Sequence, residues 1–164
     1  RVTKEISDIN WHSPEAFGTW ISRLQGQRIP TDNVLALECL SFLSLKKCIL
    51  SFRDLIRANL EWANLEWANL EWVNLEGANL EGANLEGANL INANLIDANL
   101  IDANLKLAKL IDVNFEGANL ERANLERANL EWANIQGANL FGANLFGANL
   151  KGTILEGKGI RSFT

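Results

Sequence analysis

Few residues in this sequence could carry out chemistry, and their types and spacing do not build a reactive centre. His12 is the single histidine, so serine–histidine, cysteine–histidine and multi-histidine metal arrangements are excluded within the chain. Cys39 and Cys48 are the two cysteines. They are not spaced as a Cys-x-x-Cys pair, and we interpret both as small buried hydrophobes.

The carboxylates and glycines are numerous, but they recur at a regular interval of five. Regular spacing of glutamates is typical of a solvated surface, where no desolvation changes their protonation. The glycines keep the same interval and form no glycine-rich phosphate loop. The sequence therefore predicts a protein that is not an enzyme, with no catalytic residue, no cofactor and no metal site.

One pentapeptide pattern explains the interval. It begins with Ala58-Asn59-Leu60-Glu61-Trp62 and continues to Leu155 with an apolar residue at every fifth position. Five residues advance an α-helix by about 500°, so the leucines would cover all of its sides. In one long strand an odd period would send alternate leucines to opposite faces.

The pattern is satisfied by a three-residue strand followed by a two-residue corner. In Ala-Asn-Leu the first and third side chains point inward and the asparagine points outward. Successive triplets then share one interior, and the chain coils around its own core. The predicted core residues are Leu60, Leu65, Leu70, Leu75, Leu80, Leu85, Leu90, Leu95, Phe115 and Ile135.

The run of Ala-Asn-Leu-x-x, as in Ala78-Asn79-Leu80-Glu81-Gly82, resembles the pentapeptide-repeat family. The resemblance implies a β-solenoid, namely a right-handed quadrilateral β-helix of about five coils with twenty residues in each coil. Most members of that family have no defined biochemical role. Some are dimeric acidic rods that occupy the DNA-binding site of type II topoisomerases.

Three regions are expected along the chain. Residues 1–47 form a helical segment, in which one helix begins at Ser13 as N-cap with Pro14 in its first turn. Residues 48–160 form the solenoid, and 161–164 form a tail. A solenoid exposes its core at its ends, so we interpret the helices as a cap. A separate recognition domain is the alternative.

The corners and the stacking give further predictions. Glycine after the strand suits a corner with positive φ, whereas tryptophan or arginine at that place predicts a different turn. Residues twenty apart should stack, so the asparagines should form ladders that Lys109 interrupts. Arg122 should lie over Asp102, and Glu86, Lys106 and Glu126 should alternate in sign.

Two surface regions could contact a partner. Trp62, Trp67 and Trp72, with Glu61, Glu66, Glu81 and Glu86, are the candidate interaction surface, which is either exposed or covered by the cap. Phe141, Phe146 and Ile160 are candidates for a homodimer or end contact, because the C-terminal end has little chain to cover it.

Charge limits the class of partner. Residues 58–157 contain 14 acids and 5 bases, a net of −9. Direct nucleic-acid binding is therefore not expected. No apolar stretch is long enough to span a membrane, and we expect a cytoplasmic protein. The favoured function is a structural or protein-interaction scaffold with an unknown protein partner, and the alternative is an acidic DNA mimic that binds a type II topoisomerase.

Overall fold

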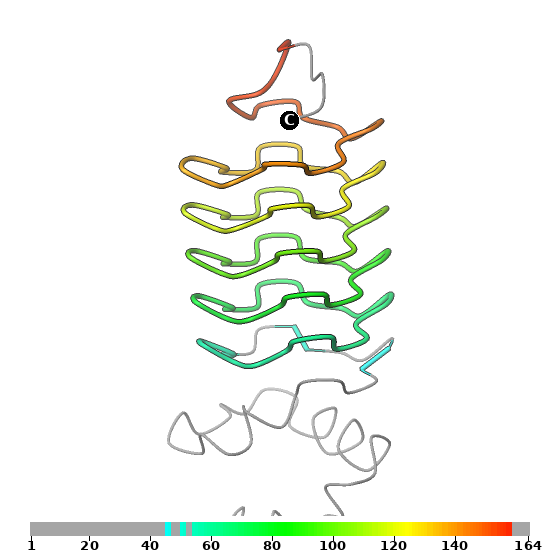
Figure 1. Ribbon diagram of the computed structural model, residues 1–164, viewed down its shortest axis with the longest axis vertical. Helices are drawn as coiled ribbons and strands as arrows, with labels where there is room; N and C mark the ends of the chain where they lie inside the picture. The colour runs from blue at the N-terminus through cyan, green and yellow to red at the C-terminus, as the bar shows by residue number, and fades with distance from the viewer. Residues whose placement is uncertain (1–44, 47–49, 52–53, 159–164) are drawn as a thin grey trace, which may run out of the picture.

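The computed structural model describes residues 45–46, 50–51 and 54–158, which stack as coils of a four-sided shaft (Figure 1). Each β-bridge between these residues is parallel and joins a residue to the one twenty further along, as Asn59 to Asn79 and Asn79 to Asn99. One coil is therefore four pentapeptides. The bridges are isolated and centred on the middle residue of each triplet, so the described residues form no helix and no longer strand.

The register reaches back into the segment that the sequence assigns to the helical extension. Leu45 is buried, and its amide donates a 2.7 Å hydrogen bond to the carbonyl of Asn64. The predicted helices, with Ser13 and Pro14, lie outside the described residues, as does the tail. The right-handed sense of the coil stays a prediction.

Every amide of a central pentapeptide has an acceptor. In residues 78–82 the first amide donates across the preceding corner at 3.0 Å. The second, third and fifth donate to carbonyls of the neighbouring coils at 2.9, 2.7 and 2.9 Å. The fourth, that of Glu81, donates to Asn79 Oδ1 at 3.2 Å. Because no donor is left without a partner, three-residue strands are sufficient to hold the coils together.

All corners share one backbone conformation, so the prediction of a different turn at tryptophan and arginine is wrong. The second corner residue has φ of +62° at Gly77 and +63° at Gly82, but also +56° at Trp62 and at Arg122. A positive φ at the third residue of a four-residue turn is the mark of a type II turn. The left-handed region costs an L-residue about 1–2 kcal/mol. The same amide makes an axial hydrogen bond to the neighbouring coil, 2.8 Å for Trp62, which offsets this cost.

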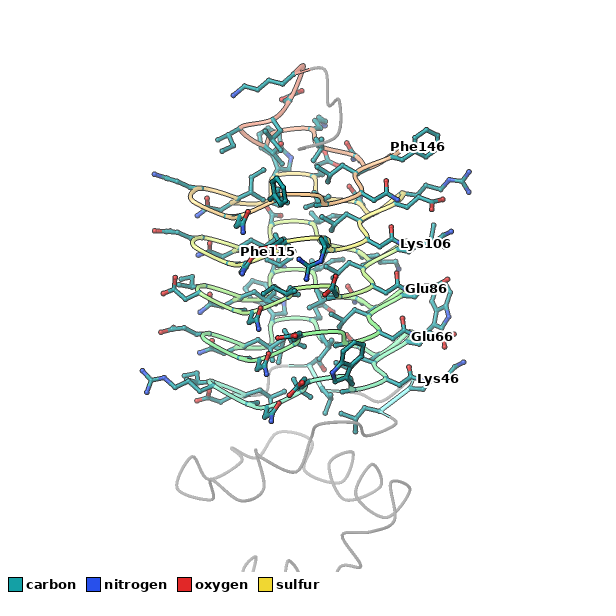
Figure 2. All side chains as sticks on the ribbon, viewed as in Figure 1. Lys46, Glu66, Glu86, Lys106, Phe115 and Phe146 are labelled. Carbon is teal, nitrogen blue, oxygen red and sulfur yellow. The ribbon has the colours of Figure 1, made fainter. Side chains whose placement is uncertain are left out.

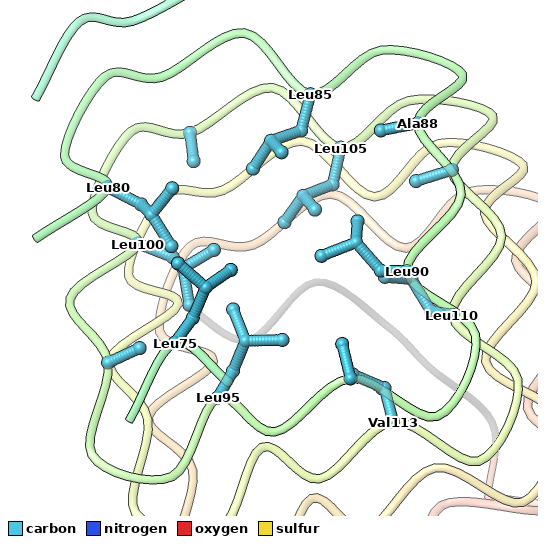
Figure 3. Packing of buried hydrophobic residues seen from close by; sticks show 14 of the residues in the cluster. Leu75, Leu80, Leu85, Ala88, Leu90, Leu95, Leu100, Leu105, Leu110 and Val113 are labelled. Atoms are coloured by element: carbon cyan, nitrogen blue, oxygen red, sulfur yellow. The ribbon is translucent and has the colours of Figure 1, made fainter. Parts of the chain in front are cut away.

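The interior is filled by the first and third residues of each triplet (Figure 3). Phe115 is fully buried, and Ile135, closer to the C-terminal end, is 3% exposed. The remaining core residues proposed from the sequence are all 0% exposed, namely Leu60, Leu65, Leu70, Leu75, Leu80, Leu85, Leu90 and Leu95. At about 1.5–3 kcal/mol for each buried leucine, four leucines per coil are a large stabilising contribution that repeats along the shaft.

Asparagine ladders run along the outside of the shaft. Asn99 Nδ2 donates to Asn79 Oδ1 at 3.1 Å and also to Glu81 Oε2 at 3.2 Å. The same Oδ1 accepts a hydrogen bond from the corner amide of Glu81, so Asn79 serves both its own corner and the next coil. Lys109 replaces one asparagine and has no oxygen with which to cap the amide of Ile111.

Candidate interaction surface

Among the described residues, no group of three or more His, Cys, Asp or Glu side chains is placed to hold a metal ion. His12, Cys39 and Cys48 lie outside the described residues. Nor does any helix among the described residues have the length and apolar character needed to cross a bilayer.

The resolved pKa shifts in the shaft belong to exposed ion pairs. A hydrogen bond from Arg122 holds the pKa of Asp102 below its usual value, and the same bond raises the pKa of Arg122. The interaction is bidentate: Arg122 Nε donates to Asp102 Oδ1 at 2.8 Å, and Arg122 Nη2 donates to Asp102 Oδ2 at 2.7 Å. A hydrogen bond to Glu131 raises the pKa of Lys151. These pairs connect neighbouring coils, which is a structural role.

Trp62, Trp67 and Trp72 stand on three successive corners of one coil and are 51%, 50% and 51% exposed. Each of the first two is tied to the glutamate before it: Trp62 Nε1 donates to Glu61 at 3.2 Å, and Trp67 Nε1 to Glu66 at 3.1 Å. The three corners of a square coil point in different directions. One flat partner therefore cannot contact all three indoles.

The inner face of two of these indoles lies against glycine of the next coil. The ring carbons of Trp62 occupy the space that a Cβ at Gly82 would need, and those of Trp67 do the same at Gly87. Trp132 repeats the arrangement at Gly152. Trp72 is followed twenty residues later by Asn92, so it does not share the arrangement. The Trp-to-Gly interval of twenty is readable in the sequence, but the packing of the ring on the glycine is not.

The acidic residues of the candidate surface lie in columns. Glu61 and Glu81 share one column, and Figure 2 shows Lys46, Glu66, Glu86 and Lys106 along another. In the second column Lys46 contacts Glu66 at 2.9 Å, and Lys106 contacts Glu126 at 3.2 Å. The expected stack of Arg122 over Asp102 is present at 2.7 Å.

The last described coil departs from the hydrogen-bond pattern of the shaft. The amide of Ile135 makes no hydrogen bond to another described backbone group, unlike that of Phe115 one coil earlier. Phe141 and Phe146 project from this coil with 58% and 71% of their surface exposed. Shallow hollows lie beside both phenylalanines, lined in part by Leu145, Leu140 and Leu155. Ile160, the third residue proposed for this contact, lies outside the described residues.

The sequence model described as "Pentapeptide repeats" matches the chain in eight copies, over residues 40–71, 68–106, 88–127, 103–142 and 123–157. The chain belongs to the pentapeptide repeat family. This result agrees with the resemblance deduced from the Ala-Asn-Leu-x-x pattern. The matched region begins inside the predicted N-terminal segment, as does the buried Leu45.

Solved structures of other pentapeptide repeat proteins are similar to the shaft. Rfr23 from the cyanobacterium Cyanothece 51142 is 48% identical with a TM-score of 0.52, over 52% of this chain and 58% of that chain. The chain thus spans little more than half the length of Rfr23. A trypsin-treated form of QnrB1, a plasmid-mediated fluoroquinolone resistance protein, is 20% identical with a TM-score of 0.55, covering 68% of this chain and 59% of that one. This second likeness shows the fold alone.

HetL, a pentapeptide repeat protein involved in heterocyst differentiation regulation in the cyanobacterium Nostoc sp. strain PCC 7120, is 36% identical. The match covers 74% of this chain and 69% of HetL, with a TM-score of 0.40. Comparison with the curated proteins found no match.

Proposed function

We propose that the chain is a non-catalytic scaffold that binds another protein through the outer surface of its shaft. The observation that carries the proposal is that large apolar side chains are held half-exposed at corners where the backbone conformation is unfavourable for them. Trp62 and Trp67 adopt φ of 56° and 58° and remain 51% and 50% exposed. Exposed aromatic residues are typical of protein interfaces, where they are enriched.

The proposal is supported by the way the interior is used. Leucine and alanine fill the shaft, and the hollows lined by described residues are shallow and open at the C-terminal end. Binding therefore has to use outward side chains. The partner is expected to be a protein, since the shaft is too acidic for direct nucleic-acid binding. We propose no membrane contact.

The test is capture of a partner by the intact chain and by corner variants. Trp62→Ala and Trp67→Ala each remove an exposed indole while leaving the core leucines unchanged. The matched control is Trp132→Ala, which removes a similar indole more than three coils away. We expect at least one of the first two variants to lose a specific partner that the control retains. Retention of every partner by all three variants would contradict the proposal.

A second candidate function is mimicry of DNA toward a type II topoisomerase. Residues 58–97 contain seven acids and no base, which is the feature that favours it. Duplex DNA, however, carries about one charge per 1.7 Å on all sides, and here the charge differs between faces. Addition of the chain to a gyrase supercoiling assay tests the idea. No inhibition at micromolar protein would exclude it.

A homodimer formed end to end is an alternative assembly, in which the C-terminal coils of two copies would cover Phe141 and Phe146. If this contact forms, the intact chain is a dimer in light scattering and Phe146→Asp, which places a charge at the centre of the contact, is a monomer. Phe141→Ala in the same assay reports how much the second aromatic contributes.

A further inference from the structure

Charge is unevenly divided among the four faces of the shaft. Because residues twenty apart stack, each face can be defined by five short segments. The basic face consists of residues 67–71, 87–91, 107–111, 127–131 and 147–151. The acidic face shares a corner with it and consists of residues 72–76, 92–96, 112–116, 132–136 and 152–156.

The basic face is the one face with a positive balance. It carries three bases, Lys109, Arg127 and Lys151, against two acids, Glu71 and Glu131. The acidic face carries four acids and no base, namely Glu76, Asp112, Glu116 and Glu156. The segments that make up the other two faces between residues 57 and 146 have net charges of −3 and −2 by the same count. The basic face is therefore the side of this acidic shaft that an acidic surface of another copy would repel least.

The three bases of the basic face differ in their ion pairs to described residues. Lys151 contacts Glu131 at 2.7 Å, and Arg127 lies 3.9 Å from Glu126. Lys109 is exposed and forms no ion pair with any described carboxylate. Beside it Leu107 is 40% exposed in a left-handed corner with φ of +59°.

Lys109 also weakens the local structure. Above and below it, Asn129 and Asn89 cap the corner amides of Glu131 and Ile91 at 3.2 and 3.3 Å. A lysine offers no such oxygen, so the amide of Ile111 loses its cap and the ladder is interrupted. Lys109 thus departs from the repeat and makes no compensating ion pair among the described residues. Such a departure points to a contact with another molecule.

We propose that the basic face of one copy docks on the acidic face of a second copy, with the shafts parallel and level. At the level of Lys109, the acidic face carries Asp112 and Glu116 on either side of Asn114. Docking at equal height would place the Lys109 ammonium between those two carboxylates. Asp112 is exposed and makes no ion pair with another described residue, so both charges are free to pair between copies.

The square section of the shaft decides how many copies assemble. The two faces meet at a corner, and Figure 3 shows the coil as an approximate square in cross-section. A head-to-tail contact between faces about 90° apart rotates each copy by a quarter turn, so four copies close a ring. The shared corner carries Trp72 and Trp132, 51% and 57% exposed, which would gather around the ring axis. One face is only about 20 Å by about 10 Å, so a single contact is small for a stable dimer, whereas each copy in the ring makes two.

The proposed ring goes beyond the scaffold function. The mass of the protein in solution tests whether the ring forms. We expect light scattering at low salt to give four times the 18.2 kDa of the chain, falling toward the monomer at about 1 M salt because exposed charges are screened. Lys109→Asn should abolish the tetramer and yet raise Tm by about 2–4 °C, since it restores the ladder and the corner cap. The matched control Lys106→Asn also removes one positive charge, but from a neighbouring face, and should keep the tetramer.

Charge exchange completes the test. Lys109→Glu should prevent assembly, and the double variant with Glu116→Lys should restore it at low salt. Monomers at every concentration, or a dimer indifferent to Lys109→Asn, would overturn the proposal. Equal loss of the tetramer in Lys106→Asn would also overturn the proposal, because the effect would then come from the net charge of the chain and not from the position of Lys109. A monomer that still captures a partner protein refutes the ring alone, and a tetramer that captures none refutes the scaffold function alone.

Discussion

The corners at Trp62 and Gly82 occupy one column of the shaft, one coil apart, and differ as much as two residues can. Their backbones do not differ: φ is +56° at the tryptophan and +63° at the glycine. The turn is imposed by the axial hydrogen bonds of the coil and accepts either residue. The ring of Trp62 beneath Gly82 occupies the space that a Cβ would need, whereas Asn92, which has a Cβ, lies over Trp72. The orientation of the ring, and not its presence alone, therefore favours glycine at 82.

Of the variants that test this comparison, Gly82→Ala is expected to change the unfolding free energy most. The new methyl group meets a rigid indole and also takes a left-handed φ, so we expect a loss of about 2–4 kcal/mol in unfolding free energy. Gly77→Ala is the matched control, since its φ is +62° and its nearest neighbour is the flexible Arg57 Cγ at 3.4 Å. It should cost about 1 kcal/mol. Equal losses in chemical denaturation would show that the indole plays no part.

A smaller effect is expected in the coupling between the two residues. Trp62→Ala removes the ring that Gly82→Ala meets, so the double variant should be more stable than the sum of the single changes predicts. We expect a coupling of at least about 1 kcal/mol in a double-mutant cycle. The same cycle with Trp72→Ala in place of Trp62→Ala should be additive, because Trp72 stands on another corner. Additivity in both cycles would contradict stacking at an interval of twenty.

The smallest effect concerns the charged pair higher in the same column. Arg122 lowers the pKa of Asp102, so the pair stabilises the fold above the ordinary pKa of 3.8 and loses this contribution as pH falls through the lowered value. Asp102→Asn should therefore lower Tm slightly at pH 7 and not at about pH 2. Asp97→Asn, at a corner with the same sign of φ, should change Tm little at either pH. A pH-independent loss in Asp102→Asn would count against the pair.

The sequence predicts the shaft because one physical constraint repeats. Leucines spaced by five can share an interior only with short strands and corners, and burial of Leu60 through Leu95 follows from it. The stack of Arg122 over Asp102 is also predictable, because in a twenty-residue coil each residue lies beside the one numbered twenty higher. The family match extends the same register to residue 40.

What the sequence did not predict depends on how a side chain lies over its neighbour. Positive φ at Trp62 does not follow from the intrinsic preference of tryptophan, because the hydrogen bonds of its coil outweigh that preference. The divergence of Trp62, Trp67 and Trp72 needs the orientation of the corners, and spacing alone does not supply it. The division of charge between faces needs the assignment of every residue to a column.

Proton NMR of the glycine α-hydrogens tests the columnar organisation most directly. An indole packed on a glycine shifts its α-hydrogens upfield through the ring current. We predict such shifts at Gly82, Gly87 and Gly152, with contacts to the protons of the tryptophan twenty residues earlier. Gly77, Gly117 and Gly137, which lie over no tryptophan, should keep ordinary shifts. Ordinary shifts at all six glycines, or contacts to a tryptophan at another interval, would contradict the account.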